Sequence, residues 1–123
     1  MLLLGILFVG GCTSATPTPL KITQADSGST QELATGQELQ ITLDANPTTG
    51  YQWGADGAVP DQLEQVGEPK FTANSNALGA SGSEVWTFKG KTSGEGVLSL
   101  KYWRTFEPTA TPAANFSVTV KVK

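Results

Sequence analysis

The amino-acid sequence predicts an all-β fold in which two antiparallel sheets pack face to face as a sandwich. Short runs of residues alternate between apolar and polar side chains, which is the pattern of a strand with one face in the core. Glycine, proline and other turn-forming residues separate these runs. No window of about eleven residues carries apolar side chains at helical spacing. The 123 residues are enough for one two-sheet core and too few for two domains.

The alternation identifies the strands in order along the chain. It is clearest in four runs: Leu39–Leu43, Val85–Phe88, Leu98–Tyr102 and Phe116–Val122. Weaker candidates are Leu20–Thr23, Thr30–Leu33, Tyr51–Gly54, Leu63–Val66 and Pro69–Thr72. About seven to nine short strands with turns between them are typical of an immunoglobulin-like sandwich. The only cysteine, Cys12, has no partner for an internal disulfide, so the core must depend on aliphatic and aromatic packing.

The N-terminal residues depart from this pattern. Residues 1–11 form an apolar run that is shorter than the roughly 20 residues of a membrane-spanning helix and is typical of a signal peptide. The Val-Gly-Gly sequence before Cys12 resembles the lipobox of bacterial lipoproteins, in which the cysteine becomes lipidated. Residues 12–19 then form a Thr/Pro linker, and residues 20–123 form the domain. These features predict an exported protein that a lipid anchor holds at the cell membrane, in the periplasm or on the cell surface.

Composition argues against several classes of function. The net charge is −3 and the sequence contains no histidine, so neither a basic surface for nucleic acid nor the commonest proton shuttle and metal ligand is available. The carboxylates that an enzyme such as a glycoside hydrolase would need lie in polar, turn-rich stretches, as solvated surface residues do: Asp44, Asp56, Asp61, Glu64 and Glu68. The sequence therefore predicts no enzyme, no cofactor and no metal site.

Three connecting segments stand out as candidate binding residues. The first comprises Asn46, Pro47, Thr48, Thr49, Gly50 and Tyr51, where a proline and a glycine brace two threonines. The second comprises Gly79, Ala80, Ser81 and Gly82, a composition that permits close backbone approach to a partner. Taken alone, each of these two also fits an ordinary turn or hairpin loop.

The third segment places an arginine and an aromatic residue where a strand enters a loop. Its residues are Arg104, Thr105 and Phe106. Arginine and aromatic side chains are enriched at binding hot spots. Phe106 lies beyond the alternating pattern of its strand, so we expect its side chain to be exposed. Trp103 is interpreted as either a sheet-face residue or a contact.

The order and spacing of the three segments resemble the chagasin family of cysteine-peptidase inhibitors. Residues 46–51 match the NPTTG motif of that family in full. Residues 79–82 match its glycine-rich motif at the outer glycines, with Ser81 in place of an expected glycine. Residues 104–106 match its RPW-like motif only at Arg104, with threonine for proline and phenylalanine for tryptophan. The resemblance covers roughly residues 22–122.

The resemblance implies a reversible, tight-binding inhibitor that occludes the cleft of a papain-like cysteine peptidase with three loops. Thr48 and Thr49 would lie nearest the catalytic cysteine of the peptidase, residues 79–82 along one side of the cleft, and residues 104–106 against the opposite wall. The family pattern also implies a monomer. Arg104 has two interpretations, a contact with a peptidase carboxylate or a brace within its own loop. The alternative function is a non-inhibitory, surface-anchored module that binds a protein or glycan, because sandwiches host many functions.

Overall fold

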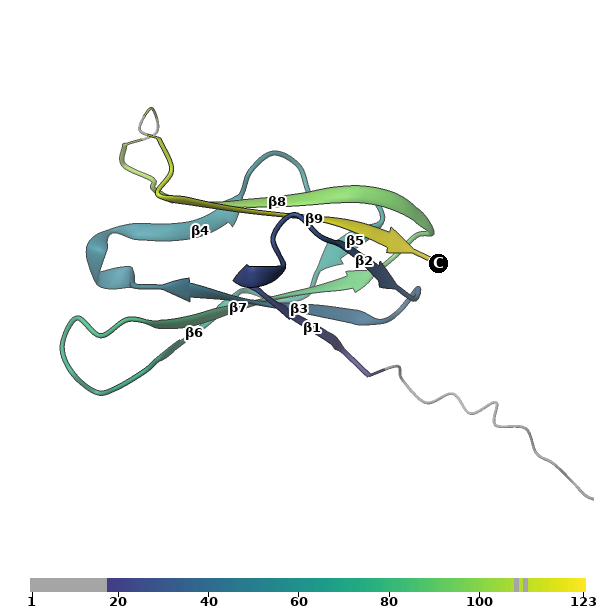
Figure 1. The fold of residues 1–123 in the computed structure, drawn as a ribbon. Coiled ribbons are helices and arrows are strands. Elements are labelled where there is room, and N and C mark those ends of the chain that lie inside the picture. The colour runs from purple at the N-terminus through teal and green to yellow at the C-terminus, as the bar shows by residue number, and fades with distance from the viewer. Residues whose placement is uncertain (1–17, 108, 110) are drawn as a thin grey trace, which may run out of the picture.

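The computed structural model describes residues 18–107, 109 and 111–123, which form two β-sheets stacked as a sandwich (Figure 1). No α-helix occurs in this part of the chain, and two 3-10 turns, η1 (Gln24–Asp26) and η2 (Pro47–Thr49), interrupt the strands. The described strands are β1 (Leu20–Thr23), β2 (Thr30–Leu33), β3 (Glu38–Ala45), β4 (Tyr51–Ala55), β5 (Leu63–Gln65), β6 (Lys70–Ala73), β7 (Gly82–Gly90), β8 (Gly94–Arg104) and β9 (Ala114–Val122). The predicted sandwich is therefore confirmed.

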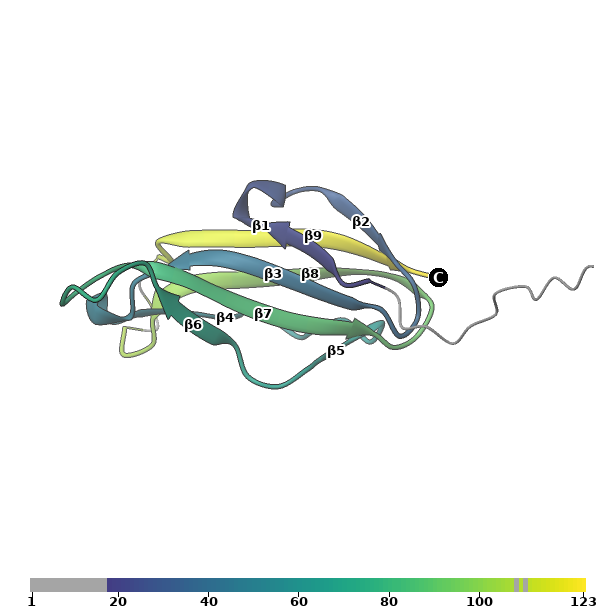
Figure 2. The ribbon, with the colours of Figure 1, turned by 90° about the horizontal axis from the view of Figure 1, so that it is seen from below.

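The first sheet has the order β1-β3-β7-β5, with β6 also paired to β7, and the second has the order β2-β9-β8-β4 (Figures 1 and 2). Most pairs are antiparallel, as predicted, but β1 pairs with β3 and β2 pairs with β9 in parallel. The chain passes from the edge of one sheet to the edge of the other through η1. Alternation along a strand shows which face is buried and not the direction of the neighbouring strand, so these two parallel pairs could not be predicted.

The core lies between the sheets and consists of the inward series of each strand. Leu39, Ile41 and Leu43 in β3 are fully buried, as are Phe88, the partner of Leu39 in the neighbouring strand β7, and Phe116 in β9 of the other sheet. The buried apolar residues are Ile22, Leu33, Leu39, Ile41, Leu43, Ala45, Trp53, Leu63, Trp86, Phe88, Leu98, Leu100, Phe116, Val118, Val120 and Val122. Burial of apolar surface on this scale makes the sandwich a rigid support for its connections.

The expected leader (residues 1–11) and the lipidation site Cys12 lie outside the described residues, as does most of the linker (residues 12–19). No helix in the described ranges is long and apolar enough to cross a membrane. The described chain reaches the sandwich at Leu20, which pairs with Leu39 near the start of β3. This point lies at the end of the sandwich opposite the connection between β3 and β4 (Figure 1).

Candidate functional site

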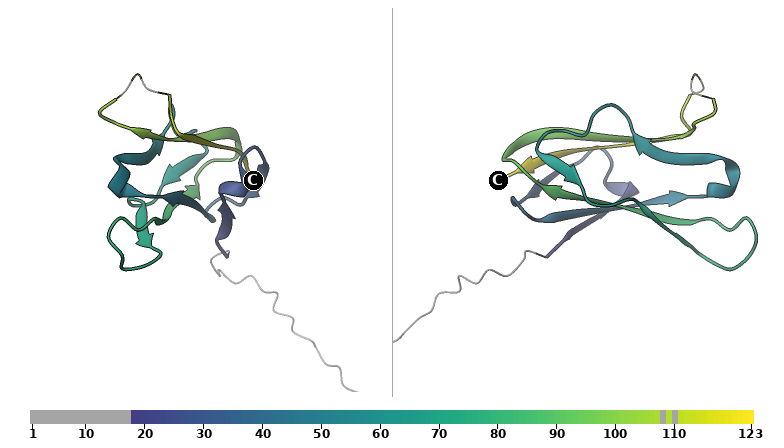
Figure 3. Two further views of the ribbon diagram at one scale, coloured as in Figure 1. Left: turned by 60° about the vertical axis from the view of Figure 1, so that its left-hand side comes forward. Right: turned by 180° about the vertical axis from the view of Figure 1, so that it is seen from behind.

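Strand register brings three connections to the same end of the sandwich. Ala45 at the end of β3 pairs with Gly82 at the start of β7, and Gly82 also pairs with Ala73 at the end of β6. In the second sheet, Tyr51 at the start of β4 pairs with Arg104 at the end of β8. We call the three parts the central loop (residues 46–50), the glycine loop (residues 74–81) and the aromatic segment (residues 104–107). The central loop lies between the other two connections (Figure 3).

The central loop is a capped 3-10 turn. Asn46 is its N-cap, since the side-chain Oδ1 accepts a hydrogen bond from the backbone N–H of Thr48 at 3.1 Å. Pro47 occupies the first turn, where no backbone N–H is needed. Gly50 ends the turn with φ of 84°, in the left-handed region that favours glycine. The sequence therefore dictates a compact tip on which Thr48 and Thr49 are exposed.

A tyrosine from the neighbouring sheet holds the base of the central loop. The hydroxyl of Tyr102 in β8 accepts a hydrogen bond from the backbone N–H of Asn46 at 2.8 Å and donates one to the carbonyl of Asn46 at 3.3 Å. The Tyr102 ring lies 5.4 Å from the Tyr51 ring and 5.1 Å from the Trp53 ring, measured between centroids. Trp53 in turn donates from its indole N–H to the carbonyl of Asp44 at 2.9 Å. The loop is thus tied to both sheets at its root.

The glycine loop carries fewer bonds. Its ends are joined by the N–H of Asn74, which donates to the carbonyl of Ser81 at 2.9 Å, and the Ala80 N–H donates to the carbonyl of Ala77 at 3.2 Å. Gly79, with φ of 76°, accepts at its carbonyl a hydrogen bond from the Asn46 side-chain amide at 3.2 Å. This bond connects the glycine loop to the central loop.

Gly82 lies in a strand, unlike the other three residues of the predicted segment 79–82. It is buried at the start of β7, and a Cβ there would lie 2.1 Å from the carbonyl oxygen of Thr72 in β6. The close approach of β6 therefore requires glycine at this position. The structure brings Gly79, Ala80 and Ser81 to the loop surface, but it places Gly82 beneath them in the sheet.

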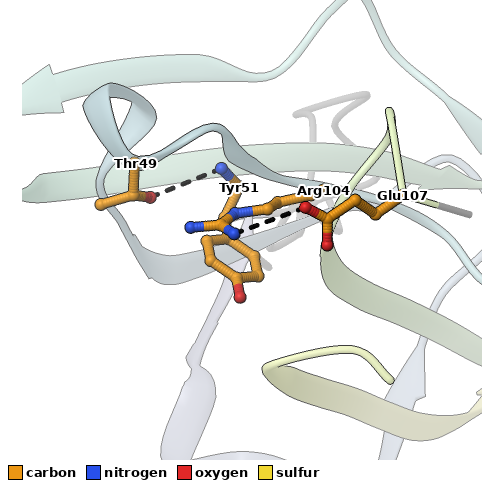
Figure 4. Close-up of polar contacts among 4 residues, drawn as sticks. All are labelled: Thr49, Tyr51, Arg104 and Glu107. Atoms are coloured by element: carbon orange, nitrogen blue, oxygen red, sulfur yellow. Dashed lines mark hydrogen bonds and ion pairs between the residues drawn. The ribbon is translucent and has the colours of Figure 1, made fainter. Parts of the chain in front are cut away.

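The aromatic segment leaves β8 as a tight turn in which the Glu107 N–H donates to the Arg104 carbonyl at 3.0 Å. Phe106 is 67% exposed, which confirms the expectation that it lies outside the core. Arg104 lies over the Tyr51 ring, with Cζ 4.6 Å from the centroid, and its Nη1 lies 3.6 Å from Oε1 of Glu107 (Figure 4). Thr105 is exposed beside them.

Trp103 lies on the outer face of the second sheet, so it is the sheet-face residue of the two interpretations. Its ring packs on Gly54 of β4, where a Cβ would come within 2.7 Å of the indole. The ammonium of Lys101 lies 4.7 Å from the centroid of the same ring. Trp103 and Arg104 therefore point away from each other along β8, because successive strand residues alternate between faces.

Sequence reasoning missed three features of this end. The alternating run Leu98–Tyr102 predicts only that the Tyr102 ring points inward, although a tyrosine at a strand end next to a turn suggests a hydrogen bond to that turn. Glu107 follows the arginine at a spacing that suits an ion pair. Leu78 is fully exposed in the glycine loop. An apolar residue flanked by turn-forming residues is the sequence pattern that could have predicted this exposure.

One carboxyl near the glycine loop, that of Glu84, has a shifted pKa. Partial burial raises the pKa of the Glu84 carboxyl, although a hydrogen bond from the Trp86 indole at 2.7 Å acts in the opposite direction. Glu84 lies on β7 below the glycine loop, where its register partners are Leu43 of β3 and Phe71 of β6. Among the residues that the structure describes, no group of three or more acidic, cysteine or histidine side chains is placed to hold a metal ion.

Comparison with known proteins identifies the family. The model for Chagasin family peptidase inhibitor I42 matches residues 32–120. Chagasin from Trypanosoma cruzi is 30% identical over 105 residues, covering 82% of this chain and 96% of chagasin. A cysteine protease inhibitor from Entamoeba histolytica has a similar structure, with a TM-score of 0.75 and 21% identity over 86% of this chain and 96% of that chain. The inhibitor PbICP-C, solved in complex with falcipain-2, gives a TM-score of 0.54 and 21% identity over 94% of this chain and 96% of that chain.

These matches agree with the resemblance found in the three sequence motifs. The family match over residues 32–120 includes strands β3 to β8 and all three connections at the loop end. The chain is a member of the chagasin family, and therefore a peptidase inhibitor rather than an enzyme.

Proposed function

We propose that the chain inhibits papain-like cysteine peptidases by inserting the central loop into the active-site cleft, with the glycine loop and the aromatic segment against the two walls. The observation that carries this proposal is the register that gathers the three connections at one end, with the central loop between its flanks. The likeness to chagasin and to an inhibitor bound to falcipain-2 supports a cysteine peptidase as the partner. The proposed contacts are Asn46, Pro47, Thr48, Thr49, Gly50, Tyr51, Gly79, Ala80, Ser81, Thr105 and Phe106, with Arg104 beside them in the aromatic segment.

The bonding of the central loop explains how an inhibitor enters such a cleft without being cleaved. The Asn46 carbonyl accepts hydrogen bonds from the Thr49 N–H at 3.2 Å and the Thr49 hydroxyl at 2.7 Å. The Pro47 carbonyl accepts one from the Gly50 N–H at 3.2 Å. Cleavage requires a carbonyl held about 3–3.5 Å from the nucleophile with aligned orbitals. Carbonyls engaged inside a compact turn resist that alignment.

The preformed shape of the central loop accounts for tight binding without any covalent step. The central loop is bonded in its final shape before it meets a partner, so little conformational freedom is lost on docking. Three connections at one end of a small domain suit a standard interface of about 800 Å² per partner. The tip is made of uncharged side chains, Pro47, Thr48 and Thr49, so inserting it buries no unpaired charge.

Titration of papain with the full-length chain tests the proposal. We expect stoichiometric, reversible inhibition, with Phe106→Ala weakening it by about 2 kcal/mol and Phe106→Trp leaving it equal or tighter by about 1 kcal/mol. Val97→Ala is the matched control, since Val97 is 53% exposed on β8 away from the loop end and should change nothing. Absence of inhibition at micromolar concentration, or equal losses in Phe106→Ala and Val97→Ala, would contradict the proposal.

We further propose that Cys12 carries a lipid after removal of residues 1–11, and that the inhibitor acts as a monomer at a membrane surface. The apolar leader, the lipobox-like residues before Cys12 and the Thr/Pro stretch that follows support this proposal. Because Leu20 enters the sandwich opposite the central loop, an anchor at this terminus leaves the three connections facing away from the membrane.

Detergent-phase partitioning in a bacterial host tests the anchor. We expect the full-length chain to enter the detergent phase and Cys12→Ser to remain in the aqueous phase with its papain inhibition intact. Identical partitioning of the two proteins would refute the lipid while leaving the inhibitory function standing. Light scattering of the Cys12→Ser protein should give the mass of one chain.

A further inference from the structure

The guanidinium of Arg104 lies near two aromatic rings of the same chain. Its guanidinium Cζ lies 4.6 Å from the centroid of the Tyr51 ring and 6.0 Å from the centroid of the Phe106 ring. Cations over aromatic faces at these distances are attracted by the ring quadrupole. The arginine therefore connects a half-buried ring of β4 to the exposed ring of the aromatic segment.

The stack continues inward from this pair. Tyr51 stacks on Tyr102 at 5.4 Å with an interplanar angle of 24°, and Tyr102 contacts Trp53 at 5.1 Å. Trp53 is 5% exposed and belongs to the core. A continuous row of planar groups thus runs from the core through Arg104 to Phe106. The same row contains the tyrosine whose hydroxyl holds the central loop.

Two of the three guanidinium nitrogens of Arg104, Nη1 and Nε, are paired or enclosed by the chain itself. Nη1 lies 3.6 Å from Glu107 Oε1 (Figure 4). Nε is buried, and in the described part of the chain it has no hydrogen-bond partner. Gly50 covers this side, because a Cβ built there would lie 4.0 Å from Nε and 3.2 Å from Phe106 Cε1. A buried, unpaired donor is unusual and calls for a reason, and stacking between two rings supplies one.

We propose that Arg104 is a positioning residue, which sets the orientation of Phe106 by stacking between Tyr51 and Phe106 and does not itself bind a peptidase carboxylate. Thr105 does not restrict the backbone φ angle as a proline would. Stacking on Arg104 instead restrains the exposed Phe106 side chain in one orientation. This inference, which chooses between the two interpretations of Arg104, rests on the proposed function for its inhibition readout.

A double-mutant cycle separates a positioning role from a direct contact. If Arg104 acts through Phe106, we expect Arg104→Ala to weaken papain inhibition about tenfold in the wild-type background and less than about twofold in the Phe106→Ala background. Arg104→Lys, which keeps the charge and loses the planar group, should weaken inhibition nearly as much as Arg104→Ala. Equal fold-changes in both backgrounds, or a fully active lysine variant, would overturn the proposal.

A measurement on the free protein tests the same claim without any peptidase. In the wild type, NMR cross-relaxation should connect the Phe106 ring protons to Gly50 and to the Arg104 side chain. We expect the Phe106–Gly50 contact to disappear in Arg104→Ala and Arg104→Lys while the thermal midpoint changes little. Retention of that contact in both variants would refute positioning even if the chain inhibits papain. Loss of the contact with no papain inhibition by any variant would refute the proposed function and leave the positioning role intact.

Discussion

The central loop and the glycine loop lie side by side at one end of the sandwich but are held in opposite ways. The central loop has a capping asparagine, a proline in its first turn, a left-handed glycine at its end and two hydrogen bonds between Asn46 and the Tyr102 hydroxyl, which accepts one and donates the other. The glycine loop is longer, with two backbone bonds of its own, one from the Ala77 N–H to Ser75 Oγ, and one from the Asn46 side chain to the Gly79 carbonyl. Its Leu78 side chain is fully exposed.

Under the proposed function, this difference gives the two loops different tasks in binding a peptidase. A loop that must enter a cleft without being cut needs its carbonyls bonded in advance, as in the central loop. A loop that lies along a wall needs to follow the shape of its partner, which few internal bonds and several small residues permit. The side-chain amide of Asn46 joins the two, so it contributes both the cap of one loop and the position of the other.

The largest expected effect comes from exchanging for alanine one left-handed glycine in each loop, Gly50 in the central loop and Gly79 in the glycine loop. Both substitutions place a Cβ at positive φ, which costs roughly 1–2 kcal/mol. At Gly50 the Cβ also lies 3.2 Å from Phe106, whereas at Gly79 the nearest atom, Thr48 Oγ1, is 4.0 Å away. We expect Gly50→Ala to weaken papain inhibition by about 2 kcal/mol or more and Gly79→Ala by about 1 kcal/mol. Equal losses in the two inhibition constants would contradict the proposed difference between the loops.

Tyr102→Phe removes the bonds that hold the central loop and keeps the ring. We expect the free energy of unfolding to fall by about 1–2 kcal/mol, because the N–H and carbonyl of Asn46 lose a half-buried partner. Inhibition should weaken with it, and the loop should be cut by papain over long incubation. Tyr51→Phe, which keeps the ring that stacks on Arg104, is the control and should change stability by less than about 0.5 kcal/mol. Denaturant titration and mass spectrometry provide the two measurements.

Asn46→Asp separates the two functions of this residue. Aspartate keeps the Oδ1 acceptor that caps the turn through the Thr48 N–H, but it loses the donor that bonds the Gly79 carbonyl. We expect stability to stay within about 0.5 kcal/mol of wild type and inhibition to weaken about threefold, whereas Asn46→Ala should lose about 1 kcal/mol of stability as well. If aspartate and alanine behave alike in both measurements, the bond between the loops contributes nothing.

The smallest effect concerns Glu84, on β7 beneath the glycine loop. Burial raises the pKa of this carboxyl in the folded protein, so the folded state favours the protonated form. The stabilising contribution of the protonated Glu84 carboxyl is therefore present at low pH and is lost as pH rises through the pKa of Glu84 in the folded protein. We expect Glu84→Gln to raise the thermal midpoint slightly at pH 7, and the difference to vanish below about pH 4. Glu95→Gln, in an exposed part of β8, is the control for net charge, and a pH-independent gain would contradict this reasoning.

The strands were predictable because alternation has a direct physical cause. Leu39, Ile41 and Leu43 had to share one face of a pleated strand, and they form the centre of the core. The turn at residues 46–50 was predictable from Pro47 and Gly50. The exposure of Phe106 followed from its position beyond the strand pattern.

The remaining features depend on residues that are distant in sequence. The bonds of Tyr102 to Asn46 span 56 positions, and no local pattern encodes them. Gly82 reads as a loop glycine until β6 is placed beside it. The role of Arg104 depends on Tyr51, which reaches it only through the pairing of β4 with β8.

Hydrogen exchange of the full-length chain with and without papain tests most directly whether the three connections act as one inhibitory surface. We expect papain to slow exchange at the backbone amides of residues 48–51, 79–81 and 104–106. The turns at the opposite end, residues 34–37 and 91–93, should exchange at unchanged rates. Protection confined to that opposite end, or to only one of the three connections, would contradict the account.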